Sequence, residues 1–232
     1  MRTICSCSAS TSATPRSRSC WPRALGRMTT KQHRTALARH WQLLLFVHLL
    51  LAPGVYAQEE AQDGRPEKES HWTILAGYGV THTSIGNTHA HVETADFILR
   101  YSRDLTRDLG SSWYLSRHAL MIELPIHLVV DPDTAPMLGI NLLACWRFTA
   151  SERLRPYLFG GGGFLYTDAD IPGLGSKYNG NYQGGAGILY RLRPKYSLNV
   201  EYRFHHVSNL GTAKPNDPLN SSKFLIGLTA LF

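Results

Sequence analysis

The sequence predicts an eight-stranded antiparallel transmembrane β-barrel of the outer-membrane type. Three observations lead to this prediction. Apolar and polar residues alternate with period two after His71, a leader-like apolar segment precedes them, and the longer polar connections fall mainly at one end of the strands. An outer-membrane barrel needs an even number of strands that are apolar outside and polar inside, and its closed sheet leaves no backbone group unpaired in lipid.

The first four predicted strands carry apolar residues at every second position, which places these residues on one face of a strand. In segment 120–130 the apolar face runs from Leu120 to Val130, whereas Glu123 and His127 belong to the opposite face. The same alternation is present in the other three segments. The four predicted strands are 72–80, 95–101, 120–130 and 140–148, and their apolar faces begin at Trp72, Ala95, Leu120 and Ile140.

The last four predicted strands are 156–166, 182–192, 196–206 and 224–232. The lipid-facing side of 156–166 stays open, because Gly160–Gly163 have no side chains to mark it. In 196–206 we expect Glu201 and Arg203 to form an ion pair inside the barrel. A soluble sandwich would bury its apolar faces between two sheets and use strands of about five or six residues. The segments here are about ten residues long, the length that crosses a membrane.

The connections support the membrane interpretation. When the strands are followed up and down, the longer polar connections 81–92, 167–179 and 207–221 lie at one end, and the short links 149–155 and Arg193-Pro194 lie at the other. Long external loops and short internal turns are typical of these barrels. Segment 102–117 does not fit this pattern. The terminal Phe232 also resembles the C-terminal assembly signal of outer-membrane barrels.

A secretory leader is predicted before the barrel. The apolar run Trp41–Ala52 follows a basic stretch and leads into the small-x-Ala pattern Val55-Tyr56-Ala57. Its twelve residues are too few for a membrane-spanning helix, which needs about 20. We therefore expect an N-terminal extension and signal peptide in 1–57 with Met28 as the natural start, a polar linker in 58–70, and the barrel domain in 71–232.

The charge distribution argues against a nucleic-acid partner. The whole chain has a formal net charge of +7, but eight of its 24 basic residues precede residue 58 and all 17 acidic residues follow it. The predicted mature protein then has 16 basic and 17 acidic residues, a net charge of −1, and offers no basic groove studded with aromatic residues. Three of the four cysteines also precede residue 58, so Cys145 has no partner for an internal disulfide.

A histidine and a serine stand together at the end of the seventh predicted strand, in the sequence Phe204-His205-His206-Val207-Ser208-Asn209. Residues two apart share a face, so His206 and Ser208 lie on the apolar, lipid-facing side, whereas His205 points into the barrel. Unpaired polar groups are costly on such a surface. As a pair, an imidazole and a hydroxyl are a general base and a nucleophile.

The run FHHxSNxG, followed by Pro215-Asn216, resembles the C-terminal motif of the lipid A 3-O-deacylase (PagL-type) family of outer-membrane enzymes. The motif covers about residues 204–220, and the eight-stranded barrel of that family would cover 71–232. The resemblance implies Ser208 as the nucleophile and His206 as the general base and acid. It also implies Asn209 and the backbone amides around Gly211 as donors to the oxyanion, and Asn216 as a supporting residue of the loop.

The third member of the triad departs from the family pattern. The family has a glutamate twelve residues after the serine, and this chain has Asn220 there. The amide oxygen of an asparagine can orient an imidazole, but it cannot stabilise an imidazolium with a full charge. Asp217 is the fallback for the third position if the loop bends suitably.

The resemblance implies lipid A of lipopolysaccharide as the substrate, the outer membrane as the location, and no cofactor. Lys214 and Lys177 are candidates to attract lipid A phosphates, although single exposed lysines are more often only solubilising. His82, His89 and His91 lie in the first long connection without cysteines or paired carboxylates, so we expect a solvated loop and not a metal site. Whether the barrel forms a homodimer stays open.

Two other functions are compatible with the sequence. One is a structural or adhesive barrel in which the His-x-Ser-Asn motif has decayed, as Asn220 hints. The other is an outer-membrane phospholipase or acyltransferase, which would share the serine chemistry and differ in donor and acceptor.

Overall fold

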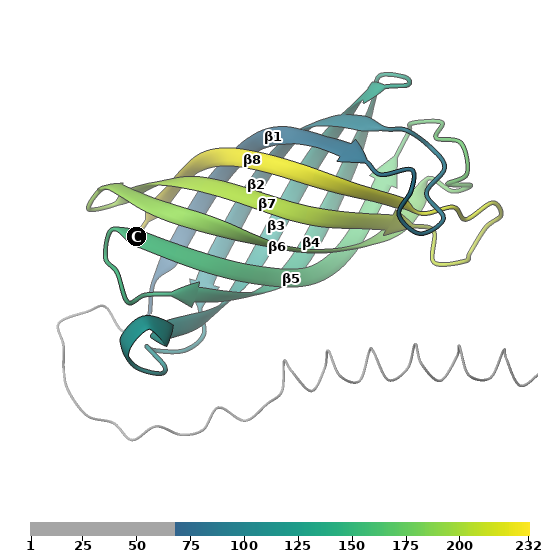
Figure 1. Ribbon diagram of the computed structural model, residues 1–232. Coiled ribbons are helices and arrows are strands. Elements are labelled where there is room, and N and C mark those ends of the chain that lie inside the picture. Colours follow the sequence, from purple (N-terminus) through teal and green to yellow (C-terminus); the bar gives the residue numbers. More distant parts are fainter. Residues whose placement is uncertain (1–67) are drawn as a thin grey trace, which may run out of the picture. The chain divides into compact units, whose positions relative to one another are not determined.

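The computed structural model describes residues 68–232, which form a closed barrel of antiparallel strands (Figure 1). Each strand pairs with the next one along the chain, and β1 pairs with β8 to close the sheet. The predicted leader 1–57 and most of the predicted linker 58–70 lie outside the described residues and stay predictions. The strands are β1 (Ser70–Thr81), β2 (Glu93–Asp104), β3 (Ser116–Asp131), β4 (Ala135–Phe148), β5 (Leu154–Thr167), β6 (Tyr178–Arg193), β7 (Tyr196–Ser208) and β8 (Leu219–Leu231).

The eight predicted strands are confirmed, but they are longer than the apolar alternation indicated. They contain 12 to 16 residues because pairing continues into polar ends that carry no hydropathy signal. Strand β8, for example, begins with Leu219-Asn220-Ser221-Ser222, five residues before the predicted start at Phe224. Within residues 68–232 no helix is long and apolar enough to cross a membrane, and the one helical segment is the 3₁₀ turn η1 (Ser112–Tyr114).

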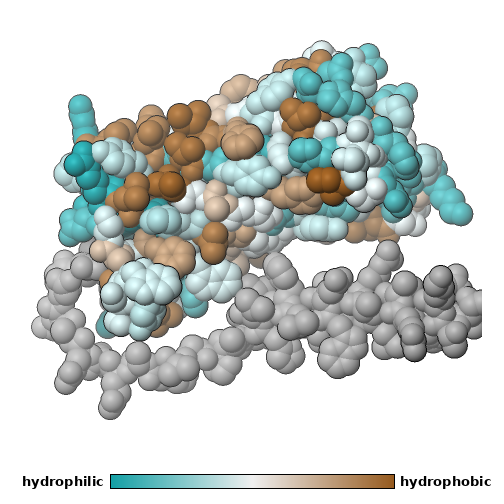
Figure 2. Space-filling view, viewed as in Figure 1, coloured by the Kyte–Doolittle hydropathy of each residue, from teal (hydrophilic) through white to brown (hydrophobic). Residues whose placement is uncertain are grey.

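The predicted apolar faces point outward. Ile74 on β1 and Phe224 on β8 expose 66% and 67% of their surface, and both belong to the faces assigned from the alternation. The open question about β5 is also answered, because Leu158 and Phe164 are exposed whereas Phe159 and Leu165 are buried. Figure 2 shows hydrophilic residues at both ends of the visible face and most of the hydrophobic residues between them. The lipid-facing wall is therefore apolar.

The middle of the barrel is filled by a network of buried ion pairs. Arg100 donates to Glu123 (2.7 Å) of the neighbouring strand β3 and to Glu201 (2.6 Å) of β7. Arg203 donates to Glu123 (3.0 Å) and also pairs with Glu201, so the expected Glu201–Arg203 ion pair is present. Buried charges need partners of this kind, because the surrounding sheet excludes water.

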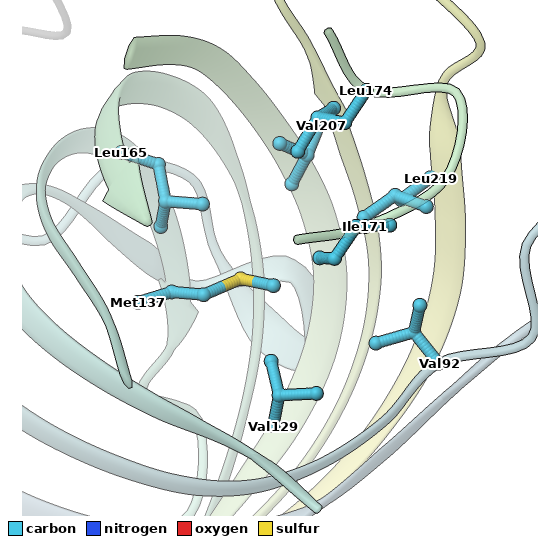
Figure 3. Close-up of a cluster of buried hydrophobic side chains, with 8 residues drawn as sticks. All are labelled: Val92, Val129, Met137, Leu165, Ile171, Leu174, Val207 and Leu219. Carbon is cyan, nitrogen blue, oxygen red and sulfur yellow. The ribbon is translucent and has the colours of Figure 1, made fainter. Parts of the chain in front are cut away.

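The end of the lumen under the long connections is closed by apolar side chains. Leu165, Val207 and Leu219 point inward from β5, β7 and β8 and meet Ile171 and Leu174, which enter from the β5–β6 connection (Figure 3). Val92, Val129 and Met137 complete this apolar plug. The plug anchors the β5–β6 connection to the barrel and so supports the loops that surround the ends of β7 and β8.

The connections follow the expected asymmetry. Residues 82–92, 168–177 and 209–218 gather at one end of the barrel, and 149–153 and 194–195 are short turns at the other (Figure 1). Segment 102–117 did not fit the predicted asymmetry, and the connection inside it is shorter than predicted, because β2 continues to Asp104 and β3 starts at Ser116. The remaining residues 105–115 fold back on the sheet through the Leu109–Ser116 bridge, and Asp108 pairs with Arg117 (2.8 Å).

Candidate active site

His206, Ser208 and Asn220 lie together on the outer wall of the barrel, at the end that carries the long connections. His206 pairs with Tyr182 of β6 on one side and with Asn220 of β8 on the other. Its Nε2 lies 3.3 Å from Ser208 Oγ, and its Nδ1 lies 2.7 Å from Asn220 Oδ1. The structure thus joins a hydroxyl, an imidazole and an amide in one hydrogen-bonded series.

The tertiary contacts hold the imidazole in place. The ring of Tyr182 stacks on the ring of His206 with 4.1 Å between centroids and 18° between planes. Ser208 is opposite Gly180, where an added Cβ would lie only 2.9 Å from the side chain of Leu210. Glycine at this position lets Leu210 fold over β6 beside the serine, which is 9% exposed.

Asp217, the fallback for the third position, has other partners. Its carboxylate pairs with His89 Nδ1 (3.3 Å) in the β1–β2 connection, and its backbone N–H donates to Gly173 O (2.8 Å). Asn220 occupies the third position instead. Of the other loop histidines, His82 bonds Ser222 (2.7 Å) and His91 bonds Glu93 (3.1 Å), so the three histidines of this connection have separate partners.

The residues expected to bind the oxyanion are used within the loop. The Nδ2 group of Asn209 is shared by the carbonyl oxygens of Leu174 (2.8 Å), Pro215 (2.9 Å) and Ala213 (3.2 Å). The N–H of Gly211 donates to Asn209 Oδ1, and the N–H of Asn209 donates to Asn216 Oδ1, both at 2.9 Å. Asn209 therefore shapes the loop in this structure, and Asn216 supports it as expected. Sequence reasoning could not foresee this, because the acceptors lie in two different connections.

Replacing Asn209 by alanine is expected to lower the free energy of unfolding by roughly 1–3 kcal/mol or more while the barrel still forms. The variant leaves three carbonyl oxygens without their donor in a buried position, and each such loss costs about 1–3 kcal/mol. The measurement is urea unfolding in detergent micelles, with heat-modifiable migration to check that the barrel forms. Asn216→Ala removes one bond only and should have the smaller effect, so the reverse order would contradict this role.

The two candidate phosphate-binding lysines differ in their surroundings. Lys177 donates to Asp168 (2.7 Å), and this hydrogen bond raises the pKa of Lys177 and lowers the pKa of Asp168. Lys214 is exposed in the β7–β8 connection. Both lysines lie at the end of the barrel where the site is, so a phosphate interaction stays a proposal for each.

One residue of the site, Thr88, was not predicted from the sequence. Thr88 is fully buried, and its Oγ1 accepts hydrogen bonds from Asn220 N (3.1 Å) and Asn220 Nδ2 (2.8 Å). Thr88 lies 132 positions before Asn220 in the chain, so no local sequence pattern connects the two residues. Only the closure of β1 against β8 brings the two residues together.

The comparisons with known proteins agree with the fold and the motif. The sequence model of the family described as lipid A 3-O-deacylase (PagL) matches residues 95–229, and no curated protein sequence matches the chain. The crystal structure of the outer membrane enzyme PagL superposes with a TM-score of 0.51 at 18% identity, covering 68% of this chain and 97% of that one.

Two further solved structures are similar. Neisserial surface protein A has a TM-score of 0.46 at 15% identity and covers 71% of this chain and 97% of its own. The attachment invasion locus protein Ail of Yersinia pestis has a TM-score of 0.45 at 12% identity and covers 72% of this chain and 100% of its own. Since the family match spans more than half of the sequence and the barrel is the fold of PagL, this chain belongs to the lipid A 3-O-deacylase (PagL) family of outer-membrane β-barrel proteins.

Proposed function

We propose that this protein is a serine esterase that removes the 3-O-linked hydroxyacyl chain from lipid A in the outer leaflet. The observation that carries the proposal is the series Ser208 Oγ, His206 Nε2 and Nδ1, Asn220 Oδ1 on the lipid-facing wall. An ester held in a membrane can reach this serine without leaving the lipid, because the hydroxyl lies on the outside of the barrel beside the long loops.

The hydrogen bonds assign a role to each group. Ser208 Oγ attacks the ester carbonyl carbon while its proton passes to His206 Nε2. The tetrahedral intermediate then collapses, and His206 returns the proton to the departing sugar oxygen, which leaves an acyl-enzyme. Water activated by His206 hydrolyses this acyl-enzyme, releases the hydroxy fatty acid and restores Ser208.

The oxyanion requires donors that the loop does not already use. In the described part of the chain, the N–H of Leu210 makes no hydrogen bond, whereas those of Asn209 and Gly211 are engaged. Leu210 has a left-handed backbone conformation with φ of 57° in the turn directly after the nucleophile's strand. We assign this amide, which is one of those around Gly211 that the family resemblance suggested, as the donor that is available to substrate.

Mass spectrometry of lipid A tests the proposal. Purified lipopolysaccharide incubated with the protein should lose the mass of one 3-hydroxyacyl chain, and the matching free hydroxy fatty acid should appear. Intact lipid A would contradict the proposal and favour a structural barrel. Vesicles of phospholipid alone form the second arm, in which release of fatty acid would show a phospholipase instead.

A further inference from the structure

Residue 220, where the chain departs from its family, is surrounded by the β1–β2 connection. The carbonyl of Asn220 accepts from His82 N (2.7 Å), and its N–H donates to Thr88 Oγ1 (3.1 Å). Its side-chain Nδ2 donates to Ile85 O (3.1 Å) and to Thr88 Oγ1 (2.8 Å). Three polar groups of one connection thus contact the backbone and the side chain of the same residue.

These contacts determine which way the amide of Asn220 points. A backbone carbonyl such as that of Ile85 can only accept, so the group that faces it must be the NH₂ of the amide. With both hydrogens of Nδ2 engaged, Oδ1 is left facing His206 Nδ1 at 2.7 Å. A reversed amide would place two acceptor oxygens against each other at Ile85.

The amide orientation in turn sets the tautomer of His206. Because Oδ1 can only accept, Nδ1 must carry the ring proton, and the lone pair of Nε2 is then directed at Ser208 Oγ. A reversed amide would require the opposite tautomer, which has no lone pair to take the proton of Ser208. A carboxylate would not need this orientation, since both of its oxygens accept.

The turn that supplies the acceptors is shaped for a close approach. Gly86 has a φ of +62°, a conformation that favours glycine, and a Cβ there would lie 3.2 Å from Asn220 Nδ2. The turn is closed by a hydrogen bond from Thr88 N to Ile85 O (3.4 Å). Glycine therefore lets the carbonyl of Ile85 and the hydroxyl of Thr88 face the same amide.

We propose that the turn Ile85–Thr88 is an amide receptor that fixes the orientation of Asn220, and that Thr88 is a positioning residue which sets the tautomer of His206 through it. With its amide oriented in this way, a neutral residue can accept the hydrogen bond of His206 Nδ1 at the third position. Asn220 is therefore a functional replacement for the glutamate of the family and not a sign that the motif has been lost. The catalytic consequence rests on the proposed esterase function, whereas the tautomer does not.

The test is Thr88→Val, compared with the wild type by ¹⁵N NMR of the histidine rings in detergent micelles at about pH 8, well above the ordinary imidazole pKa. His206→Gln identifies the His206 signals. The wild type should carry its proton on Nδ1, and Thr88→Val should move population to the Nε2–H form. We expect kcat for acyl release to fall about tenfold with KM unchanged, and Thr88→Ser to restore both readouts.

Two further variants keep the proposal falsifiable. Gly86→Ala keeps the hydroxyl but displaces the turn, so it should shift the tautomer even if Thr88→Val fails to form a heat-modifiable barrel. Thr81→Val is the matched control, because the hydroxyl of Thr81 donates to Ala90 O (2.9 Å) and accepts from Val92 N (2.8 Å) of the same connection, and neither bond involves Asn220. An unchanged tautomer in both Thr88→Val and Gly86→Ala, or an equal shift in Thr81→Val, would overturn the proposal. A wild type that releases no acyl chain would refute the esterase function and leave the tautomer result intact.

Discussion

Ser208→Ala is expected to lower kcat/KM for acyl release from lipopolysaccharide on the order of 10⁶-fold, and His206→Ala by a similar factor. Removing the hydroxyl removes the attacking atom, and removing the imidazole removes the group that takes its proton across 3.3 Å. Because the two groups act as one unit, the double variant should be about as slow as either single variant. The measurement is the rate of hydroxy fatty acid release under saturating and subsaturating lipopolysaccharide.

A matched control separates chemistry from damage to the barrel. Ser222 is another lipid-facing serine near the site, and it bonds Tyr202 (2.8 Å) and His82 (2.7 Å) without contacting His206. Ser222→Ala should retain most of the activity. Undiminished release from either Ser208→Ala or His206→Ala, in protein that migrates as a folded barrel, would remove these residues from the mechanism.

Arg203→Met is expected to lower the free energy of unfolding by about 3–5 kcal/mol. Arg203 is fully buried and donates to Glu123 (3.0 Å) and Gln183 (2.6 Å), and it also pairs with Glu201. Without its guanidinium group, two carboxylates share the single charge of Arg100 in the lumen. The loss is large because an uncompensated buried carboxylate cannot be solvated there.

Urea unfolding in detergent micelles measures this loss. Arg193→Met, at the exposed end of β6, makes the same side-chain change without a buried partner and should alter stability little. The double variant Arg203→Met with Glu123→Leu should recover part of the stability, because it removes one of the unpaired charges. Equal losses in Arg203→Met and Arg193→Met would show that the lumenal network does not stabilise the barrel.

The outward and inward faces could be predicted because strand parity is local. An apolar residue at every second position marks one face regardless of what pairs with it, and this placed Ile74, Phe224, His206 and Ser208 outside and Glu201, Arg203 and His205 inside. Parity leaves the face of a segment open where glycines take the place of side chains or where a strand begins with polar residues. The faces of β5 were left open because Gly160–Gly163 have no side chains. The first five residues of β8 were not predicted as strand because they are mostly polar.

The loop contacts could not be predicted, since they join segments far apart in the sequence. Asp217 and Asn220 were both near enough to serve as third residue, and only the folded loops separate them, with Asp217 beside His89 and Asn220 beside His206. The family resemblance suggested Asn209 as an oxyanion donor. Its amide instead joins the β5–β6 and β7–β8 connections.

The barrel, the lipid-facing side of His206 and Ser208, and the resemblance to a family could be predicted from the sequence alone, because they depend on period-two alternation and a contiguous motif. How the site is completed depends on contacts that form only in the folded barrel. Closing β1 against β8 brings Ile85 and Thr88 to Asn220, and this contact orients an amide that has two unlike ends. Hydrogen bonds between distant loops depend on strand register and barrel closure, neither of which leaves a local pattern in the chain.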